Sequence, residues 1–487
     1  MFLNEIIDID IKNIKITNID IDSRKITKGG LFFALKGVTT SGHNFIDNAI
    51  ENGAAAVICH NHEENIEFKN NIPIYKTPKI FDLLIKSLHQ IYPKLPKNIF
   101  AVTGTNGKSS VCYFIFQLLD FLGLKSAFIG TLGINSNVKI SGLIESSLTT
   151  ADIITLYKNL NILANNGVEN IALEASSIGV EQGRLRGVDI ALGAFTNFTQ
   201  DHLDLHKSME NYFTAKMMLF NSLMKSNSLA ILNSDIDEYD KITEICQKKN
   251  HQIFSYGKNG NFIKLLDAKS KKDVWNLRLE IFGKIFECQI KEIANFQIYN
   301  ILCALSCVIS YHNLSQERIE FLLQKLPELI SVEGRMQKVV TLENSAKIFI
   351  DYAHTPDAIE NILTNSKKIP HNKLHILFGS GGDRDKIKRP LMGKIASRLA
   401  DKIIITDDNP RFEDGGIIRS EIIAACDISK VTEIADRREA IKYAVENLRD
   451  NDILLIAGKG HEKYQIIGDK KIEMDEKKII MDAIHFT

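Results

Sequence analysis

The sequence predicts an α/β protein of three domains, and three observations lead to this prediction. The chain has 487 residues, about three times the length of an ordinary domain, and 44% of them are hydrophobic. In residues 98–330, apolar segments of strand length alternate with helical segments, as in a parallel sheet with helical crossovers. In residues 331–487, each apolar segment of strand length runs directly into a polar loop. We therefore expect domains at 1–97, 98–330 and 331–487.

The composition argues against several classes of protein. The 60 Lys and Arg residues balance the 60 Asp and Glu residues, which argues against an electrostatic nucleic-acid binder or a polybasic membrane-surface protein. No apolar run approaches the length of a membrane span, and residues 1–5 lack the basic start of a signal peptide. The seven cysteines form no CxxC pair, and Cys303 and Cys307 are expected to pack in a core rather than bind a metal. The composition indicates a cytoplasmic protein with no nucleic-acid partner and no membrane insertion.

Residues 1–97 have the pattern of a small α/β lobe. The polar cluster Asp22–Lys25 lies between apolar stretches and is expected to form a turn. Pro93 and Pro96 come just before the next apolar segment and indicate a linker. The elements expected in this lobe are a strand at 31–35, a helix at 45–52 that Gly53 ends, and a strand at 54–59.

The most informative segment is a strand at 99–102, followed by the turn Gly104-Thr105-Asn106-Gly107-Lys108 and a helix opening at Ser109-Ser110. Such a strand, turn and helix direct backbone N–H groups at one point, which suits an anion. Lys108 adds a mobile positive charge for the outer phosphates of a nucleotide, and the Ser109 hydroxyl can ligate the accompanying Mg²⁺. The usual P-loop has a glycine where this chain has Val102, so the loop is a shortened variant. An ordinary turn with an exposed lysine is the alternative, but the pattern favours a nucleoside triphosphate site.

Three further features of the middle segment carry candidate functional residues. A strand at 170–173 ends in Glu174, at the sheet edge where ligands of open α/β sheets gather. Another strand runs into the polar segment 197–206, whose aspartates and histidines indicate either a metal site or a hydrogen-bonded loop beside the phosphates. Lys216 lies in an apolar helix at 212–220, where a lysine ordinarily extends its amine to water and a functional role is the less common alternative.

The last segment predicts a parallel, doubly wound sheet of the Rossmann-like kind, because helical stretches separate its strands. Arg384 and Arg411 lie in the loops after the second and third strands, and an arginine fork grips carboxylates or phosphates with two hydrogen bonds. Surface ion pairs are the alternative for both arginines. The strands are expected at 347–352, 374–378, 403–406 and 453–457.

Four motifs resemble the signatures of the Mur ligase family, and more narrowly those of its UDP-N-acetylmuramoyl-tripeptide synthetases. They are Gly104-Thr105-Asn106-Gly107-Lys108-Ser109, Asp351-Tyr352-Ala353-His354-Thr355-Pro356-Asp357, Gly381-Gly382-Asp383-Arg384-Asp385-Lys386 and Gly458-Lys459-Gly460-His461-Glu462. The resemblance spans essentially the whole chain. It implies an N-terminal UDP-substrate-binding domain, a central ATP-binding domain of P-loop type and a C-terminal amino-acid-binding domain.

The resemblance also implies a reaction. A ligase of peptidoglycan precursor synthesis would use ATP to make an acyl phosphate on UDP-N-acetylmuramoyl-L-alanyl-D-glutamate, and an incoming amine would then displace phosphate. ATP and Mg²⁺ are the implied cofactors, and a monomer is expected.

Residue roles follow from the resemblance, position by position. The implied catalytic residues are Lys108, Glu174, His202 and Lys216. The implied metal ligands are Ser109, Glu174 and Lys216, the last as a carbamate. The implied ATP-binding residues are Gly104, Thr105, Asn106, Gly107, Lys108, Ser109, Ser110, Asn300, Arg335 and Asp351. The implied UDP-substrate-binding residues are Ser23, Thr149, Thr150, Ser176, Gln182 and Arg184. The implied amino-acid-binding residues are Arg384, Asp408, Asn409, Pro410, Arg411, Gly458 and Glu462.

The tetrapeptide Asp408-Asn409-Pro410-Arg411 marks the diaminopimelate-adding members of the family. meso-Diaminopimelate carries a carboxylate beside its distal amine, and an arginine on a proline-stiffened turn can pair with that carboxylate. The open alternatives are an L-lysine-adding ligase, a folylpolyglutamate synthase-like ligase, and a nucleotide-gated binding module without ligase chemistry. The chain departs from the family pattern at Leu148, Ile178 and Gln297, where relatives carry asparagine, histidine and asparagine.

Overall fold

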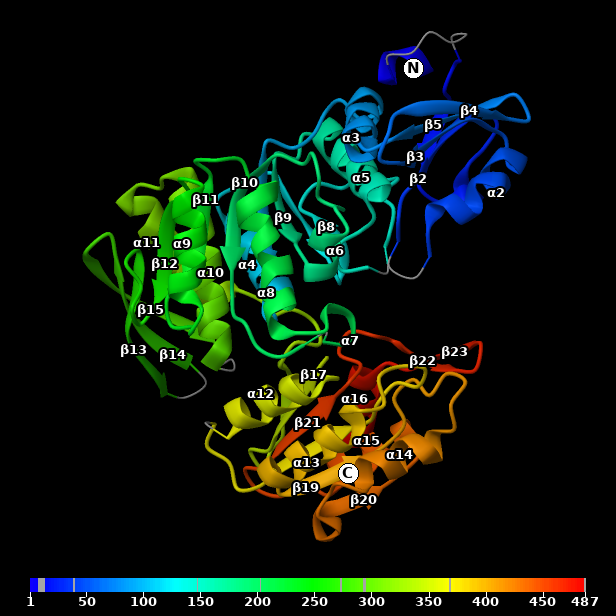
Figure 1. Cartoon of the computed structure of the whole chain (residues 1–487). Coiled ribbons are helices and arrows are strands. Elements are labelled where there is room, and N and C mark those ends of the chain that lie inside the picture. The colour runs from blue at the N-terminus through cyan, green and yellow to red at the C-terminus, as the bar shows by residue number, and fades with distance from the viewer. Residues whose placement is uncertain are drawn as a thin grey trace.

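The computed structural model describes residues 1–7, 14–37, 40–146, 148–201, 203–271, 274–291, 295–367 and 369–485. Figure 1 shows three bodies along the chain, each with helices packed around a sheet of its own. The prediction of a three-domain α/β protein is therefore confirmed. The boundaries expected at 97 and 330 stay predictions, but no sheet is shared across them among the described residues.

The N-terminal body is a five-stranded sheet in the order β1-β2-β3-β5-β4, parallel except for the edge strand β4. The strands and the helix expected at 31–59 are present. The expected turn at Ser23–Lys25 is a single 3₁₀ turn, capped by the Asp22 side chain. The bounds are α1 Leu3–Ile6, β1 Asn18–Asp20, β2 Gly30–Ala34, α2 Ile46–Glu51, β3 Ala54–His60, β4 Asn65–Lys69, β5 Ile72–Thr77 and α3 Ile80–Ile91.

The central body has a ten-stranded sheet in the order β15-β14-β13-β12-β11-β10-β6-β9-β7-β8. The strands from β13 to β7 in this order are parallel, as expected, whereas β15, β14 and β8 run antiparallel to their neighbours. The sheet is therefore parallel through its centre, as predicted, and the antiparallel strands at its two edges were not predicted. In β14 and β15 buried and exposed residues alternate in part, because antiparallel edge strands can leave one face to solvent. The strands are β6 Asn98–Thr103, β7 Ser126–Gly130, β8 Gly133–Ser136, β9 Asn170–Glu174, β10 Ile190–Phe195, β11 Leu229–Asn233, β12 Gln252–Gly257, β13 Ile263–Lys271, β14 Val274–Ile281 and β15 Lys284–Lys291.

The helix α10 (Asn295–His312) lies deep in this body and packs on α4 (Lys108–Phe121), the helix that follows the phosphate loop. Cys303 and Cys307 are buried in the same core cluster, which confirms their expected packing role. The other helices of this body are α5 Ile153–Asn165, α6 Ser177–Glu181, α7 Leu203–His206, α8 Met209–Met218, α9 Tyr239–Lys248 and α11 Gln316–Lys325.

The C-terminal body is a six-stranded sheet in the order β16-β17-β21-β18-β19-β20. The four expected strands are present and parallel, and β16 adds an antiparallel edge. Pro356 begins α12 behind a Thr355 cap, as proline suits the first turn of a helix. The strands of this sheet are β16 Gln337–Thr341, β17 Lys347–Asp351, β18 Leu374–Phe378, β19 Lys402–Ile405, β20 Val431–Glu433 and β21 Ile453–Ala457. A separate antiparallel pair is formed by β22 Tyr464–Ile467 and β23 Lys470–Glu473. The helices are α12 Pro356–Ser366, α13 Lys388–Leu399, α14 Gly415–Ile423, α15 Arg437–Glu446 and α16 Glu476–His485.

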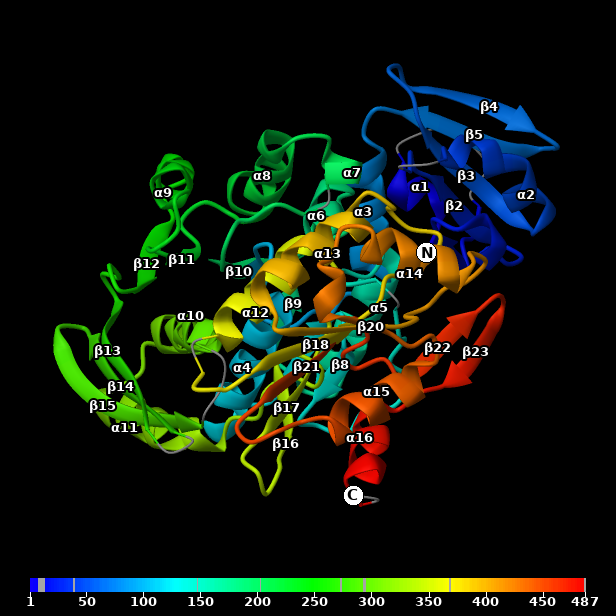
Figure 2. The ribbon, with the colours of Figure 1, turned by 90° about the horizontal axis from the view of Figure 1, so that it is seen from below.

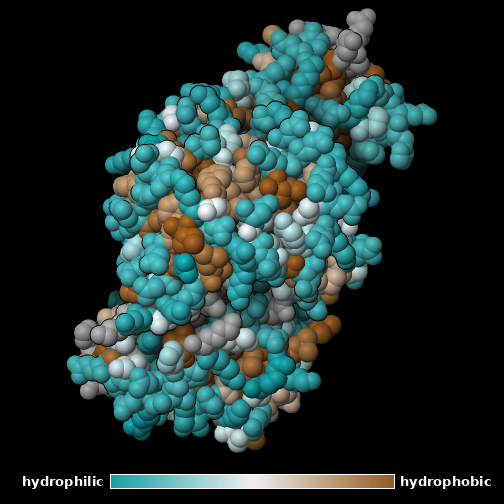
Figure 3. Space-filling model, turned by 90° about the vertical axis from the view of Figure 1, so that its left-hand side faces the viewer, coloured by the Kyte–Doolittle hydropathy of each residue, from teal (hydrophilic) through white to brown (hydrophobic). Residues whose placement is uncertain are grey.

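The C-terminal body lies below the central one in Figure 1, and the view from below in Figure 2 places it in front of the central sheet. On the face drawn in Figure 3, hydrophobic residues form separate small patches among hydrophilic ones. Among the described residues, no helix is both long and apolar enough to span a bilayer.

Candidate active site

The phosphate loop connects β6 to α4 with two glycines at positive φ, Gly104 at +140° and Gly107 at +87°. A Cβ at Gly104 would overlap the hydroxyl of Thr196, and one at Gly107 would overlap the side-chain oxygen of Asn300. Glycine is required at both positions for conformation and for space. The expected strand, turn and helix are present, with the helix beginning at Lys108.

The polar segment after β10 lies against this loop. Asn197 accepts hydrogen bonds from the backbone N–H groups of Thr105 (2.9 Å) and Asn106 (2.8 Å), and Thr196 donates to the Asn106 carbonyl (2.6 Å). The described part of the segment is therefore hydrogen-bonded to the phosphate loop, which agrees with one of the two expected alternatives. His202 lies outside the described residues.

Two lysine amines converge on the Gly104 carbonyl oxygen, at 3.0 Å from Lys108 Nζ and 2.7 Å from Lys216 Nζ. Lys108 also donates to the Thr105 carbonyl at 2.7 Å. Lys216 is only 1% exposed, and its amine lies 4.3 Å from the centre of the Tyr212 ring. The expectation that Lys216 extends its amine to water was therefore wrong, because α8 turns this residue toward the loop.

Burial and a neighbouring positive charge lower the pKa of both amines. Burial lowers the pKa of Lys108, and the nearby Arg335 lowers it further, whereas the carboxylates of Glu174 and Asp201 act in the opposite direction. Burial, followed by the charge of Lys108, lowers the pKa of Lys216 well below its usual value. The site thus brings together four segments that are far apart in the sequence, around residues 108, 174, 201–216 and 335.

Glu174 is the buried carboxylate of this site, at 1% exposure. One of its oxygens accepts a hydrogen bond from the Thr131 N–H (2.9 Å) and the other from the Thr131 hydroxyl (3.2 Å). The Thr131 hydroxyl also lies 3.1 Å from that of Thr149. The carboxylate is thereby oriented at the carboxyl end of β9, as expected.

Ser109 and Glu174 supply a hydroxyl and a carboxylate, the hard oxygen donors that Mg²⁺ prefers. Outside the gaps named above, no cluster of three or more His, Cys, Asp or Glu residues could hold a metal. This agrees with magnesium chemistry, because Mg²⁺ is usually bound through one or two carboxylates together with substrate phosphates and waters. The residues present fit such an ion.

The remaining nucleotide candidates lie on α10 and at the entry to the C-terminal body. Gln297 accepts a hydrogen bond from Asn300 (2.8 Å) and donates one to the Ser110 hydroxyl (3.4 Å), so this departure from the family pattern is buried against the loop helix. The Arg335 guanidinium lies 4.7 Å from the centre of the Tyr352 ring. Asp351 accepts from the Met336 and Ala353 N–H groups, and burial raises its pKa.

The expected UDP-substrate residues of the central body form one hydrogen-bonded group. Thr150 donates to the Glu174 carbonyl (2.8 Å), and its hydroxyl lies 3.0 Å from that of Ser176. Arg184 donates to the Thr150 carbonyl (2.6 Å) and to the Gln182 side chain (2.6 Å). This group is joined to the backbone of Glu174 through the hydroxyl of Thr150.

A cavity of about 790 Å³ lies between the N-terminal and central bodies. It is lined by Ser23 from the N-terminal side and by Gln182 and Arg184 from the central side. This volume lies in the range of ligand pockets that bind a whole cofactor or drug-sized molecule. Two other residues depart from the family pattern. Leu148 is 41% exposed, and Ile178 lies at the start of α6.

The loop of residues 406–414 follows β19 and carries the tetrapeptide expected to bind the amino acid, and we call it the amino-acid loop for that expectation. Asn409 is 5% exposed, and its side-chain oxygen accepts hydrogen bonds from Lys459 Nζ and the Ile466 N–H, both at 2.9 Å. Its side-chain nitrogen donates to Glu462 at 3.0 Å. A Cβ at Gly458 would overlap a carboxylate oxygen of Asp408. The tetrapeptide and the glycine-rich loop after β21 therefore form one unit.

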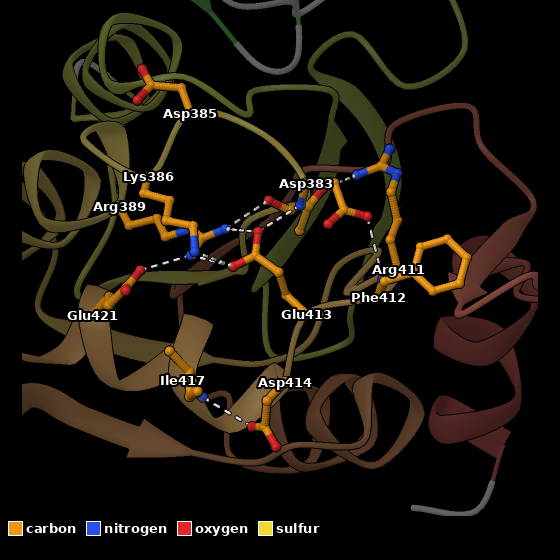
Figure 4. Close-up of polar contacts among 12 residues, drawn as sticks. Asp383, Asp385, Lys386, Arg389, Arg411, Phe412, Glu413, Asp414, Ile417 and Glu421 are labelled. Atoms are coloured by element: carbon orange, nitrogen blue, oxygen red, sulfur yellow. Dashed lines mark hydrogen bonds and ion pairs between the residues drawn. The ribbon is translucent and has the colours of Figure 1, made fainter.

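Arg411 has a left-handed backbone (φ +55°) and donates to the Gly382 carbonyl at 2.8 Å, as Figure 4 shows. A Cβ at Gly381 would lie 2.8 Å from Arg411 Nη1 and 3.8 Å from Arg384 Cγ, so both arginines flank this glycine. Arg384 itself is exposed. The sequence analysis assigned no role to Lys459, Arg389 or Glu413. Of these three residues, only Lys459 carried a signal in the sequence, because it lies between two glycines of a motif.

Comparisons with known proteins agree with this architecture. Residues 15–95 match the family model "Mur ligase family, catalytic domain", residues 102–308 match "Mur ligase middle domain", and residues 334–460 match "Mur ligase, glutamate ligase domain".

Two curated relatives are named UDP-N-acetylmuramoyl-L-alanyl-D-glutamate--2,6-diaminopimelate ligase. The protein from Rickettsia conorii is 42% identical over 480 residues, which cover 96% of each chain. The protein from Agrobacterium fabrum is 37% identical, covering 99% of this chain and 96% of its own. A solved structure with the same name has a TM-score of 0.69 at 32% identity, and it covers 100% of this chain and 99% of its own. The resemblance seen in the sequence motifs is confirmed, and the chain belongs to the Mur ligase family.

Proposed function

We propose that this chain is an ATP-dependent, ADP-forming ligase that adds meso-diaminopimelate to UDP-N-acetylmuramoyl-L-alanyl-D-glutamate in peptidoglycan precursor synthesis. The activity in the names of its relatives supports the proposal. The observation that carries it is the convergence of the Lys108 and Lys216 amines on the Gly104 carbonyl. Positioned cations beside a helix N-terminus stabilise the charge of a transferring phosphoryl group.

Activation of a carboxylate is the first half of the reaction. The carboxylate of the D-glutamate side chain attacks the γ-phosphorus of ATP, ADP leaves, and an acyl phosphate forms. Lys108 and the N–H groups at the start of α4 hold the outer phosphates in line for this transfer. In the second half the amine attacks the acyl carbon, loses a proton, and displaces inorganic phosphate through a tetrahedral intermediate.

Lys216 serves this site best as a carbamate. Burial, followed by the charge of Lys108, lowers the pKa of Lys216 well below its usual value, which favours the neutral amine that attacks CO₂ and loses a proton to give the carbamate. The carbamate would replace the positive charge of the ammonium form by a negative charge next to the phosphate loop, where it would act with Ser109 and Glu174, the two other oxygen donors proposed for Mg²⁺. When bound, the ion would neutralise charge on the phosphates. His202 stays a catalytic candidate on its family motif alone.

The remaining roles follow the grouping of the side chains. The cavity with Ser23, Gln182 and Arg184 would take the UDP end of the substrate, and Thr149, Thr150 and Ser176 would lead its peptide to Glu174. Asn300, Arg335 and Asp351 would contact ATP. The loops with Arg384, Gly458, Glu462 and the tetrapeptide 408–411 would hold the amino acid. We place this chemistry in the cytoplasm, which agrees with seven free cysteines, and expect a monomer.

A phosphate-release assay tests the proposal. Purified protein receives ATP, Mg²⁺ and UDP-N-acetylmuramoyl-L-alanyl-D-glutamate with meso-diaminopimelate, L-lysine or neither. Release should require both the dipeptide substrate and meso-diaminopimelate, with a preference over lysine of about 10⁴-fold, because a site built to pair a charge rejects the analogue that lacks it. Equal or better turnover of L-lysine would overturn the amino-acid assignment alone. Release with a folate and L-glutamate would favour folylpolyglutamate synthesis, and no release with any combination would favour a binding module.

A further inference from the structure

Arg389 is a charged side chain with no exposure to solvent, on the first turn of α13. Its Nη1 donates to Glu413 at 3.1 Å and to Glu421 at 2.7 Å. Its Nη2 donates to Glu413 at 3.0 Å and to the Gly381 carbonyl at 3.3 Å. A buried arginine with this many acceptors is costly to unpair, so its geometry is well defined.

Glu413 is the centre of this network, as Figure 4 shows, and it follows Arg411 by two residues. Besides its fork with Arg389, it accepts the Asp383 N–H at 2.6 Å and the Lys386 amine at 3.1 Å. The Arg389 hydrogen bonds lower the pKa of Glu413 to about 2, so the carboxylate stays charged at any working pH. Arg389 and Glu413 thereby tie the loop 408–413 to the loop 381–384.

The two loops are held against each other in conformations that side chains other than glycine disfavour. Arg411 and Asp383 both have positive φ, at +55° and +53°. The Gly382 N–H donates to the Asn409 carbonyl at 2.9 Å, and a Cβ at Gly382 would overlap the Pro410 carbonyl oxygen. Such backbone conformations persist only where surrounding contacts over-determine them. The charged contacts between Arg389 on α13 and Glu413 in the loop 408–413 are of this kind.

We infer that Arg389 and Glu413 are positioning residues for amino-acid selection, which hold Arg411 and Arg384 in the arrangement that recognises the distal carboxylate of the incoming amino acid. This inference rests on the proposed function for the identity of the amino acid. Neither residue touches substrate in this arrangement; each acts through the loop that carries an arginine.

Glu413→Gln tests the inference, because it keeps the size of the side chain while removing the charge that pairs with Arg389. The KM for meso-diaminopimelate should rise about tenfold to a hundredfold, the loss expected for hydrogen bonds to a charged group, while the KM for ATP stays within about twofold. Arg389→Met should raise the same KM. The double variant should be no worse than the worse single variant, because residues that act through each other are not additive.

Arg398→Gln is the matched control, since Arg398 lies on the same helix in an exposed pair with Glu360. It should leave both KM values unchanged. A Glu413→Gln enzyme with an unchanged KM for diaminopimelate would overturn the inference. So would equal increases in both KM values with a lower kcat, the mark of a general structural loss.

Hydrogen exchange separates this inference from the proposed function. In Glu413→Gln, the amides of Gly382 and Asp383 should exchange faster than in the wild type, and those of α4 should not. If the wild-type protein fails to use diaminopimelate, the proposed function is wrong, but hydrogen exchange still tests whether Arg389 and Glu413 hold the two loops together. Unchanged exchange at both amides would overturn the inference.

Discussion

The phosphate loop and the amino-acid loop both follow parallel strands, yet they treat buried positive charge in opposite ways. Lys108 and Lys216 point their amines at one backbone carbonyl, and within the described residues neither forms a salt bridge. Arg389 is buried like Lys216, whereas Lys108 is half-buried, and Arg389 pairs with the two carboxylates Glu413 and Glu421. The lysines of the central site therefore have no carboxylate paired directly with them in the described structure, whereas the charge of Arg389 beside the C-terminal loop is neutralised by two carboxylates.

This difference separates a site that changes charge from one that keeps its shape. Uncompensated buried cations are unfavourable until an anion arrives, which suits a phosphate that is bound, transferred and released. A compensated arginine gains nothing more from an anion, so its pairing serves to fix the position of its neighbours. Substitutions at Lys108, Lys216 and Arg411 should therefore affect different steps of the reaction.

Lys108→Ala should abolish ligation, with a loss of at least about 10³-fold in kcat, because the charge that stabilises the transferring phosphoryl group is gone. Its amine contacts only two loop carbonyls in the described structure, so the melting temperature should change little. Phosphate release and thermal unfolding are the measurements, with Lys225→Ala, an exposed lysine paired with Asp189, as the control. Turnover at the wild-type rate would remove the phosphate-loop assignment.

Lys216→Ala should lose about 10²-fold or more in kcat and recover part of it when a short carboxylic acid such as acetate is added, because the acid replaces the carbamate oxygens. Lys108→Ala should show no such recovery, which makes it the internal control. Full activity of Lys216→Ala without added acid would return this lysine to a purely structural role.

Arg411→Ala should raise the KM for meso-diaminopimelate about tenfold to a hundredfold with little change in the KM for ATP. The cause is the lost charge opposite the distal carboxylate, since the backbone of the loop stays tied through Asn409 and Glu413. Steady-state kinetics in both substrates measure the effect, and Arg398→Ala is the control. If KM rises equally for L-lysine and for diaminopimelate, Arg411 does not read the distal carboxylate.

The contribution of Lys216 to the stability of the apoprotein should grow as the pH rises toward 10.5 in buffer free of CO₂. The pKa of Lys216 is lowered in the folded state, so between that pKa and the unfolded value of 10.5 the unfolded chain binds more protons at this residue. This contribution to the free energy of unfolding should therefore rise by about 1 kcal/mol per pH unit in this window, against the opposite contributions of buried tyrosines and cysteines whose pKa values are raised. Denaturant unfolding at several pH values measures the slope, which Lys216→Met should reduce and Lys225→Met should not. An identical slope in Lys216→Met would show that Lys216 is charged in the folded state.

The features that could be predicted from the sequence are those that depend on residues adjacent along the chain. A buried strand, two glycines and a lysine are adjacent along the chain, so the phosphate loop could be predicted from Gly104 to Ser109. The same holds for the four parallel strands of the C-terminal body and for the turn that carries Arg411. The antiparallel edge at β14 and β15 was not predicted, because the pairing of a strand depends on its packing against the neighbouring strands of the sheet.

The contacts between charged side chains could not be predicted from the sequence, because they depend on tertiary packing. Lys216 is 112 residues from the carbonyl that its amine contacts, and its apolar neighbours made an exposed amine the ordinary expectation. Arg389 and Glu413, 24 residues apart, carry no motif of their own, and their pairing exists because α13 packs beneath two loops at once. Electrostatic interaction depends on distance and burial, and neither quantity can be read from spacing along the chain.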